Sequence, residues 1–244
     1  IAENVRTCPI VLLSGPSGSG KTTTAMKIAE ALRGMGIGSQ SLAMDDYFRT
    51  VNPRTAPRTP EGDIDFESPA CLDMDLLGKH LNALARGEEI HLPRYNFVTR
   101  VQSGPIGRPM RLGKDEVVVC EGIHALNDDI AAYCPDAFRL YISARSVVVD
   151  GDGQEIFKGT WMRLLRRLVR DSNFRGTPAA ATLDMWANVR RGEKRFISPF
   201  KERANLMFDS SFPCEVSIMK NFAAPLLAAV PEGAERYAEI RSIL

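Results

Sequence analysis

The feature that most restricts this 244-residue chain is a glycine-rich loop with the pattern G-x-x-x-x-G-K-[ST]. The loop follows a short apolar run, 9–13, and precedes apolar residues at helical spacing from Ala25 to Leu32. Glycines let backbone N–H groups turn toward a phosphate, and a helix N-terminus favours an anion. A chance glycine-rich turn would lack this strand–loop–helix context. The loop therefore predicts binding of ATP by Gly15, Pro16, Ser17, Gly18, Ser19, Gly20, Lys21, Thr22 and Thr23.

Two side chains of this loop have the chemistry that phosphoryl transfer needs. Lys21 offers a positive charge to the β- and γ-phosphates, and the Thr22 hydroxyl is placed to bind Mg²⁺. We therefore count Lys21 among the catalytic residues, Thr22 among the metal ligands, and ATP and Mg²⁺ as the cofactors.

The order of apolar segments predicts an α/β fold with a parallel sheet and helices on both faces. The expected strands are 9–13, 41–44, 116–120, 138–143, 206–210 and 216–219. The expected helices are 71–86, 159–171, 178–191 and 234–244, and 49–65 is expected to be a long loop. We interpret residues 1–244 as a single domain with a helical lid over about 150–192.

Acidic residues follow two of the expected strands. Asp45 comes after the strand 41–44, and Glu121 comes after the strand 116–120. In an open parallel sheet, ligands bind beyond the carboxyl ends of the strands. Either acid could bind Mg²⁺ or accept a proton from an attacking hydroxyl. The alternative is that both are solvated or capping acids, which the nearby phosphate loop makes less attractive.

Charge is distributed unevenly along the chain. The formal net charge is +1, which gives no global indication of nucleic-acid or membrane binding. The segment 158–195, however, holds ten Lys or Arg and three acids, a net charge of +7. Four of its arginines share one helix face, namely Arg163, Arg166, Arg167 and Arg170, and Arg175 follows. This cluster indicates either a mobile lid over a polyanion or a solvated basic face.

The cysteines and the chain start indicate the cellular setting. The five cysteines are odd in number and form no CxxC pair, so we expect reduced thiols in the cytoplasm. No signal peptide or long apolar segment is present. The three histidines are dispersed and predict packing positions, not a metal site. The chain starts with Ile1, which suggests a fragment of a longer protein.

Seven motifs resemble those of the uridine kinase / phosphoribulokinase-type family of P-loop kinases. They are GPSGSGKTT (15–23), MDDYF (44–48), DFESP (65–69), LPRYNF (92–97), VVCEGIHAL (118–126), RRLVRDSNFRG (166–176) and FISPFKERANLMF (196–208). The chain looks closest to the bacterial nucleoside-kinase branch, in which a region similar to part of threonyl-tRNA synthetase precedes the kinase. The resemblance implies a P-loop NTPase fold and transfer of phosphate to the 5′-hydroxyl of a nucleoside.

The resemblance also implies roles for individual residues. Thr22, Asp45 and Glu121 would surround Mg²⁺, and Asp45 would be the base for the 5′-hydroxyl. Glu67 stands where uridine kinases carry an aspartate that holds the ribose, and Tyr95 matches a tyrosine that contacts the nucleoside.

Further residues are expected around the bound substrates. Arg167, Arg170 and Arg175 match lid arginines that contact phosphate or substrate and are predicted to be catalytic. Phe48 and Arg100 complete the expected substrate-binding set, in which Phe48 could either stack on a base or simply pack.

Three positions depart from uridine kinases where the base is read. Arg100 replaces a histidine, Thr177 replaces the second arginine of an RGR motif, and Met185 replaces a glutamine. These changes favour broad nucleoside acceptance or a base other than uracil or cytosine. Two alternatives stay open, namely a kinase for another hydroxyl compound such as a sugar phosphate, and a non-catalytic nucleotide sensor. A homo-oligomer is also left open.

Overall fold

The computed structural model describes residues 1–97, 99–103, 107–234 and 237–243. Its chain divides into two compact units. The first unit comprises residues 1–15, 21–141 and 192–207. The second unit comprises residues 16–20, 142–191 and 208–244. The phosphate loop therefore contains residues of both units: Gly15 and Lys21 belong to the first, and the residues between them belong to the second.

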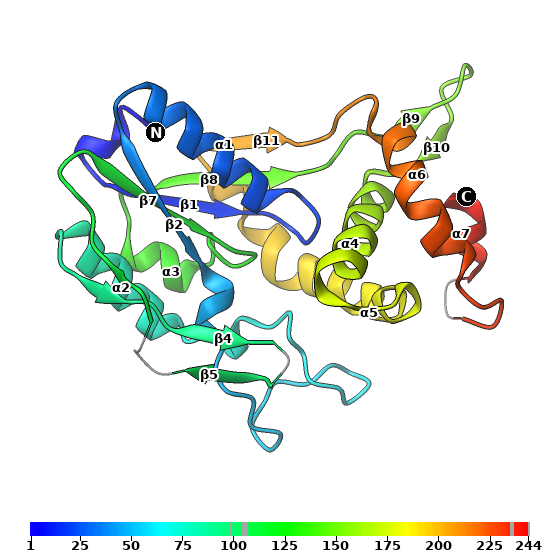
Figure 1. Cartoon of the computed structure of the whole chain (residues 1–244), viewed down its shortest axis with the longest axis horizontal. Helices are drawn as coiled ribbons and strands as arrows, with labels where there is room; N and C mark the ends of the chain where they lie inside the picture. Colours follow the sequence, from blue (N-terminus) through cyan, green and yellow to red (C-terminus); the bar gives the residue numbers. More distant parts are fainter. Residues whose placement is uncertain (98, 104–106, 235–236, 244) are drawn as a thin grey trace. The chain divides into compact units, whose positions relative to one another are not determined.

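The central sheet of the first unit has the strand order β11–β8–β1–β7–β2 (Figure 1). Its strands are β1 (Ile10–Ser14), β2 (Gly38–Ala43), β7 (Glu116–Glu121), β8 (Phe138–Ser143) and β11 (Leu206–Asp209). The pairs β1–β7, β1–β8 and β2–β7 run parallel, as predicted. The last two residues of β8 and of β11 are grouped with the second unit.

Helices cover both faces of this sheet. All five residues of β1 are buried, and its alternate residues Ile10 and Leu12 join a core with Leu77 and Ile130. Those two come from α2 (Met74–Ala85) and α3 (Asp128–Tyr133), whereas α1 (Lys21–Gly34) contacts β1, β2 and β7. A strand buried on both faces reads as a continuous apolar run, which is why these strands were predictable.

The first unit also contains short hairpins and 3-10 turns. The hairpin strands are β3 (Ile90–His91), β4 (Arg94–Asn96), β5 (Val101–Ser103) and β6 (Pro109–Met110), paired as β3–β6 and β4–β5. Single 3-10 turns lie at Asn4–Arg6, Met44–Tyr47, Pro69–Cys71 and Ser198–Arg203. The sequence did not indicate these hairpins, because strands of two or three residues carry no clear alternation. The expected loop 49–65 is irregular, as predicted.

The second unit is mainly helical. Its helices are α4 (Gly159–Arg175), α5 (Ala179–Gly192, whose last residue belongs to the first unit), α6 (Glu215–Ala228) and α7 (Tyr237–Ile243), with the hairpin β9 (Val148–Val149) and β10 (Glu155–Phe157). Leu165, Leu168, Trp186 and Leu227 are part of their common core. Gly176 ends α4 in the left-handed conformation with φ 62°, which glycine adopts at little cost. The two predicted basic helices and the turn near Gly176 are therefore confirmed.

One predicted strand is wrong. Residues 216–219 lie in the first turns of α6, not in a strand. A four-residue apolar run cannot distinguish a strand from a buried helix segment, and here Glu215 in the first turn favours the helix N-terminus. Helix α2 also begins later than expected, because the Asp73 side chain accepts a hydrogen bond from the Leu76 N–H and caps it.

Candidate active site

The phosphate loop connects β1 to α1, as the sequence predicted. Lys21 is the first residue of α1, and its Nζ donates a 2.9 Å hydrogen bond to the Gly15 carbonyl across the loop. Gly18 and Gly20 have φ angles of 74° and 86°, which residues with a side chain rarely adopt. A loop of this shape at a helix N-terminus is suited to a phosphate.

The two strand-end acids lie on neighbouring strands. Ala43 and Glu121 are partners in the register of β2 and β7, and Leu13 of β1 also pairs with Glu121. Asp45 follows β2 in the 3-10 turn Met44–Tyr47. Both acids therefore stand at the carboxyl edge of the sheet, the edge from which the phosphate loop leaves β1.

The proposed metal ligands include one pair in direct contact. The Thr22 hydroxyl donates a 2.9 Å hydrogen bond to Glu121 Oε1. Mg²⁺ is commonly held by one or two carboxylates together with substrate phosphates and water. A hydroxyl and a carboxylate side by side at a phosphate loop fit this donor set, with Asp45 just beyond the end of the adjacent strand β2.

The predicted acceptor residues lie in loops and in the β4–β5 hairpin. Phe48 and Tyr95 have ring centroids 5.3 Å apart, and Phe97, which the sequence analysis did not select, lies 4.9 Å from Tyr95 and 5.9 Å from Phe48. Burial raises the pKa of Tyr95, and its hydroxyl finds no hydrogen-bond partner among the residues that the structure describes.

Arg100 lies at the end of the turn that joins β4 and β5. It has φ 57°, and its guanidinium group lies 5.3 Å from the ring centroid of Phe66, the residue before Glu67. The Arg100 side chain is thus held over the segment that carries the predicted ribose-binding carboxylate. This contact was not visible in the sequence, because 34 positions separate the two residues.

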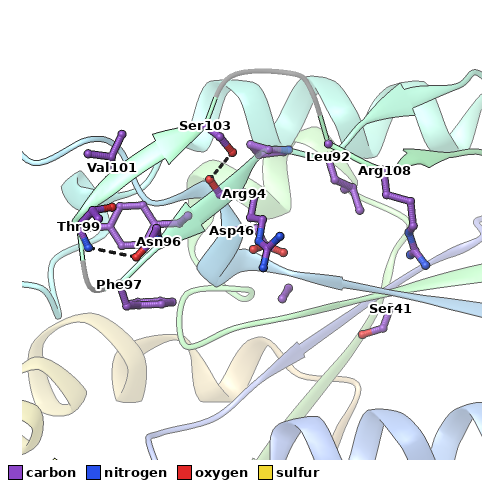
Figure 2. Close-up of a pocket in the computed structure, with 14 residues that line it drawn as sticks. Ser41, Asp46, Leu92, Arg94, Asn96, Phe97, Thr99, Val101, Ser103 and Arg108 are labelled. Atoms are coloured by element: carbon purple, nitrogen blue, oxygen red, sulfur yellow. Dashed lines mark hydrogen bonds between the residues drawn. The ribbon is translucent and has the colours of Figure 1, made fainter. Parts of the chain in front are cut away.

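A cavity of about 1210 Å³ opens beside the hairpin (Figure 2). Tyr95 and Phe97 line it together with Asp46, Arg94 and Arg108. Figure 2 shows the Arg94 and Asp46 side chains close to each other. Burial raises the pKa of Asp46, while the Tyr95 N–H and Arg94 act in the opposite direction. The sequence analysis selected neither Arg94 nor Arg108 as a candidate.

The arginines of α4 contact the middle of the phosphate loop within the second unit. Arg163 Nη1 donates to the Ser17 carbonyl (3.3 Å), Arg166 Nη1 to the Gly18 carbonyl (3.1 Å) and Arg167 Nη1 to Ser17 Oγ (2.9 Å). Helix α4 approaches so closely that a Cβ on Gly18 would overlap the Arg163 carbonyl. Arg163 is only 2% exposed, so this face of the helix is not a solvated basic face.

Acids neutralise this cluster more fully than the local sequence indicated. Asp171, buried at 2% exposure, pairs with Arg167, Arg170 and Arg175 at 3.2, 2.7 and 3.6 Å. Glu215 of α6 forms a bidentate pair with Arg166 at 2.5 and 2.6 Å. Sequence reasoning missed Glu215 because it lies 49 positions away from its partner.

Comparison with known proteins decides the family. The model of the Phosphoribulokinase / Uridine kinase family matches residues 10–216. The chain belongs to this family. As a member, it is an ATP-dependent kinase with the P-loop NTPase fold, as the resemblance implied.

Two relatives agree with this membership. The chain is 30% identical to a uridine kinase of Deinococcus deserti over 81% of this chain and 86% of that protein. It is 28% identical to a uridine kinase of Staphylococcus haemolyticus over 86% and 91% of the two chains.

Among solved structures, a possible uridine kinase from Bacillus stearothermophilus aligns with a TM-score of 0.53 and 20% identity, covering 82% and 88% of the chains. A D-glycerate 3-kinase from Cryptococcus neoformans aligns with a TM-score of 0.52 and 15% identity over 80% of each chain. Identities this low show the shared kinase fold alone. In the part of the chain that the structure describes, no helix is both long and apolar enough to span a membrane.

Proposed function

We propose that this kinase transfers the γ-phosphoryl group of ATP to the 5′-hydroxyl of a ribonucleoside. The observation that carries the proposal is the arrangement at the sheet edge. Thr22 is hydrogen-bonded to Glu121, and Asp45 follows the adjacent strand, whose last residue Ala43 pairs with Glu121. This edge combines a phosphate-binding loop with two carboxylates, which a kinase needs and a simple nucleotide-binding module does not.

Each residue at this edge has a distinct task in the proposed reaction. Lys21 provides positive charge toward the β- and γ-phosphates, while Thr22 and Glu121 would hold Mg²⁺ together with Asp45. When bound, Mg²⁺ neutralises part of the phosphate charge. Asp45 accepts the proton of the 5′-hydroxyl while the hydroxyl oxygen forms a bond to the γ-phosphorus. At the same time the bond between the γ-phosphorus and the oxygen that bridges it to the β-phosphate breaks, and ADP leaves.

The lid arginines contribute through the second unit. Arg167 contacts Ser17 of the phosphate loop, and Arg170 and Arg175 share Asp171 with it. We propose that these arginines stabilise the charge on the transferring phosphoryl group, with Asp171 holding their guanidinium groups in place.

The acceptor is expected to lie between carboxylate and aromatic groups. A Glu67 carboxylate can accept hydrogen bonds from two vicinal ribose hydroxyls, and the rings of Phe48 and Tyr95 can pack on a flat base. The uridine kinases among the relatives support a nucleoside as the acceptor. The base itself would be chosen differently, because Arg100 stands where those enzymes are expected to carry a histidine.

A second candidate acceptor is an anionic hydroxyl compound such as a sugar phosphate. Arg94 and Arg108 on the cavity wall favour it, because they add positive charge beyond what a neutral nucleoside requires. Both candidates share the phosphate-binding residues and differ only in the acceptor.

An acceptor panel separates the two candidates. ATP consumption would be followed with uridine, cytidine, adenosine, guanosine, inosine, 2′-deoxyuridine and several sugar phosphates, and ³¹P NMR would identify the product. Lys21→Ala measured in parallel reports the background from contaminating kinases. We expect a nucleoside 5′-monophosphate from at least one ribonucleoside. Turnover with a sugar phosphate and with no nucleoside would replace the nucleoside proposal with the second candidate.

A further inference from the structure

His124 is a buried polar side chain without a partner, and it lies close to the proposed site. It stands three residues after Glu121, is 2% exposed, and neither ring nitrogen has a hydrogen-bond partner in the described part of the chain. Native proteins keep few such groups, because burial without a hydrogen bond is unfavourable. An unsatisfied buried histidine therefore calls for a functional explanation.

The surroundings of the ring come from two segments distant in sequence. The Phe196 ring packs edge-on against His124, with centroids 6.3 Å apart and planes at 78°. Burial lowers the pKa of His124 to about 4, while the backbone of Phe196 and of Glu67 acts in the opposite direction. The imidazole is therefore neutral near pH 7, with one N–H to donate. The backbone of Phe196 and that of Glu67 lie near the ring, but neither makes a hydrogen bond of normal length and angle to it.

The same two segments also meet at Gly192. A Cβ added to Gly192 would overlap the Cβ of Glu67, so only glycine allows this approach. Gly192 directly precedes a π-helical turn, Glu193–Ile197, which contains Phe196. Such turns are rare and frequently occur at functional sites. Glu67 is thus close to Gly192 through its side chain and to His124 through its backbone.

The segment that carries His124 is itself anchored to the end of β1. The Ser14 hydroxyl donates a 2.9 Å hydrogen bond to the Ile123 carbonyl, and the Gly122 N–H donates one of 3.1 Å to the Leu13 carbonyl. Asn127 N–H donates to the His124 carbonyl at 2.9 Å. Since β1 leads into the phosphate loop, the position of His124 is tied to that of the loop within the first unit.

We propose that His124 is a positioning residue for the acceptor, which holds the loop carrying Glu67 against the π-helical turn Glu193–Ile197. The expected effect on acceptor kinetics rests on the proposed function, in which the acceptor is a ribonucleoside. In the free protein the ring already packs against Phe196 of the turn. When the acceptor engages Glu67, the loop and the turn close further on the ring, and the neutral imidazole donates its N–H to the backbone carbonyl of Phe196 or of Glu67. The Glu67 carboxylate then stands at a set distance from the phosphate loop, and small misplacements at such a site cost large factors in rate.

The kinetic test compares two substitutions with a control. His124→Leu removes both nitrogens, His124→Gln keeps an N–H donor, and His91→Leu alters an exposed histidine. For the best ribonucleoside and its 2′-deoxy analogue, His124→Leu should raise the acceptor KM about tenfold and erase the preference for ribose, with the ATP KM nearly unchanged. His124→Gln should recover most of both properties, and His91→Leu should match the wild type. An unchanged acceptor KM and ribose preference in His124→Leu would overturn the proposal.

Hydrogen exchange without substrate tests the positioning role independently of the acceptor. In His124→Leu, amides of residues 65–68 and 193–197 should exchange faster than in the wild type, while those of β7 keep their protection. If the leucine variant does not fold, His124→Phe, which also removes both ring nitrogens, takes its place. Unchanged exchange in both segments overturns the role of His124. Faster exchange in a protein that phosphorylates no nucleoside would instead support the positioning role and refute the proposed acceptor.

Discussion

The proposed phosphate-binding part and the proposed acceptor-binding part of this kinase are built in different ways. The first uses the ends of β1, β2 and β7 together with a loop whose shape depends on glycines, so the parallel register itself aligns Leu13, Ala43 and Glu121. The second uses irregular segments and a short hairpin, where Phe48, Tyr95 and Phe97 pack on one another. Regular strands position groups through the backbone, whereas loops position them through side-chain contacts.

Despite this difference, each part has polar groups with and without hydrogen-bond partners. In the phosphate-binding part, Lys21, Thr22 and Arg167 all form hydrogen bonds to neighbouring groups. The Ser19 hydroxyl of the phosphate loop, the Tyr95 hydroxyl and both His124 nitrogens have no partner among the described residues. Both parts therefore contain polar groups that a bound ligand could satisfy.

The largest expected effect is the loss of Lys21. Lys21→Ala should reduce kcat by at least 10²–10³-fold, roughly the cost of removing a charge-stabilising group. The fold should persist, because the Lys21 side chain is only partly buried and its hydrogen bond to the Gly15 carbonyl lies within the loop. Coupled ATP assays give the rate and circular dichroism checks the fold. Turnover near that of the wild type would break the assignment of this loop as the phosphate site.

The second effect concerns the proposed base. Asp45→Asn should lower kcat by about 10²-fold, with a smaller change in ATP affinity. Rapid-quench single-turnover kinetics measure the rate of the chemical step, and calorimetry measures the ATP affinity. If ATP–Mg²⁺ affinity collapses while the chemical step survives, Asp45 belongs to the metal site alone and Glu121→Gln should behave in the same way.

The third effect tests the acceptor-binding part. Glu67→Gln should lower kcat/KM for the ribonucleoside by about tenfold or more, because a hydrogen bond to a charged acceptor is lost. The 2′-deoxynucleoside should be affected much less. Ratios of kcat/KM for the two substrates measure this directly. Equal losses for both substrates would show that Glu67 does not contact the ribose hydroxyls.

The fourth effect is on stability and concerns the arginine cluster. Glu215→Gln should lower the free energy of unfolding by about 1–3 kcal/mol, because the partly buried Arg166 loses its bidentate partner. The matched control is Glu30→Gln, which removes the exposed Lys27–Glu30 pair and should leave the unfolding transition unchanged. Urea titrations compare the two. Equal effects would mean that the Arg166–Glu215 pair acts as an ordinary surface pair.

The effect that is smallest near neutral pH is a pH dependence of stability from His124, which develops only as the pH falls. Its pKa is lowered to about 4 in the folded state from 6.5, so the unfolded chain binds the proton more readily. Stability from this group is present above pH 6.5 and is lost as the pH falls toward 4, by at most about 1.4 kcal/mol per pH unit. His124→Gln should flatten the profile in this window. Urea titrations at several pH values measure it, and an identical slope in the variant would contradict the buried neutral imidazole.

The sequence by itself determined the phosphate-binding part almost completely. The glycine pattern, Lys21, Thr22 and the acids after two apolar runs are local signals, and the alternation of strands and helices implied the register that brings them to one edge. The central strands were predictable because burial on both faces leaves continuous apolar runs. The predicted strand 216–219 failed because so short an apolar run does not define its own secondary structure.

Only the tertiary structure decided which distant residues meet. The Arg166–Glu215 pair, the Arg100–Phe66 contact, the approach of Gly192 to Glu67 and the burial of His124 join segments far apart in the chain. No local pattern marks such pairs, because hydrogen bonding and packing depend on distance in space and not on spacing in sequence. His124 is the clearest case, since the sequence offers an isolated histidine and only the fold shows that its two nitrogens are buried without partners.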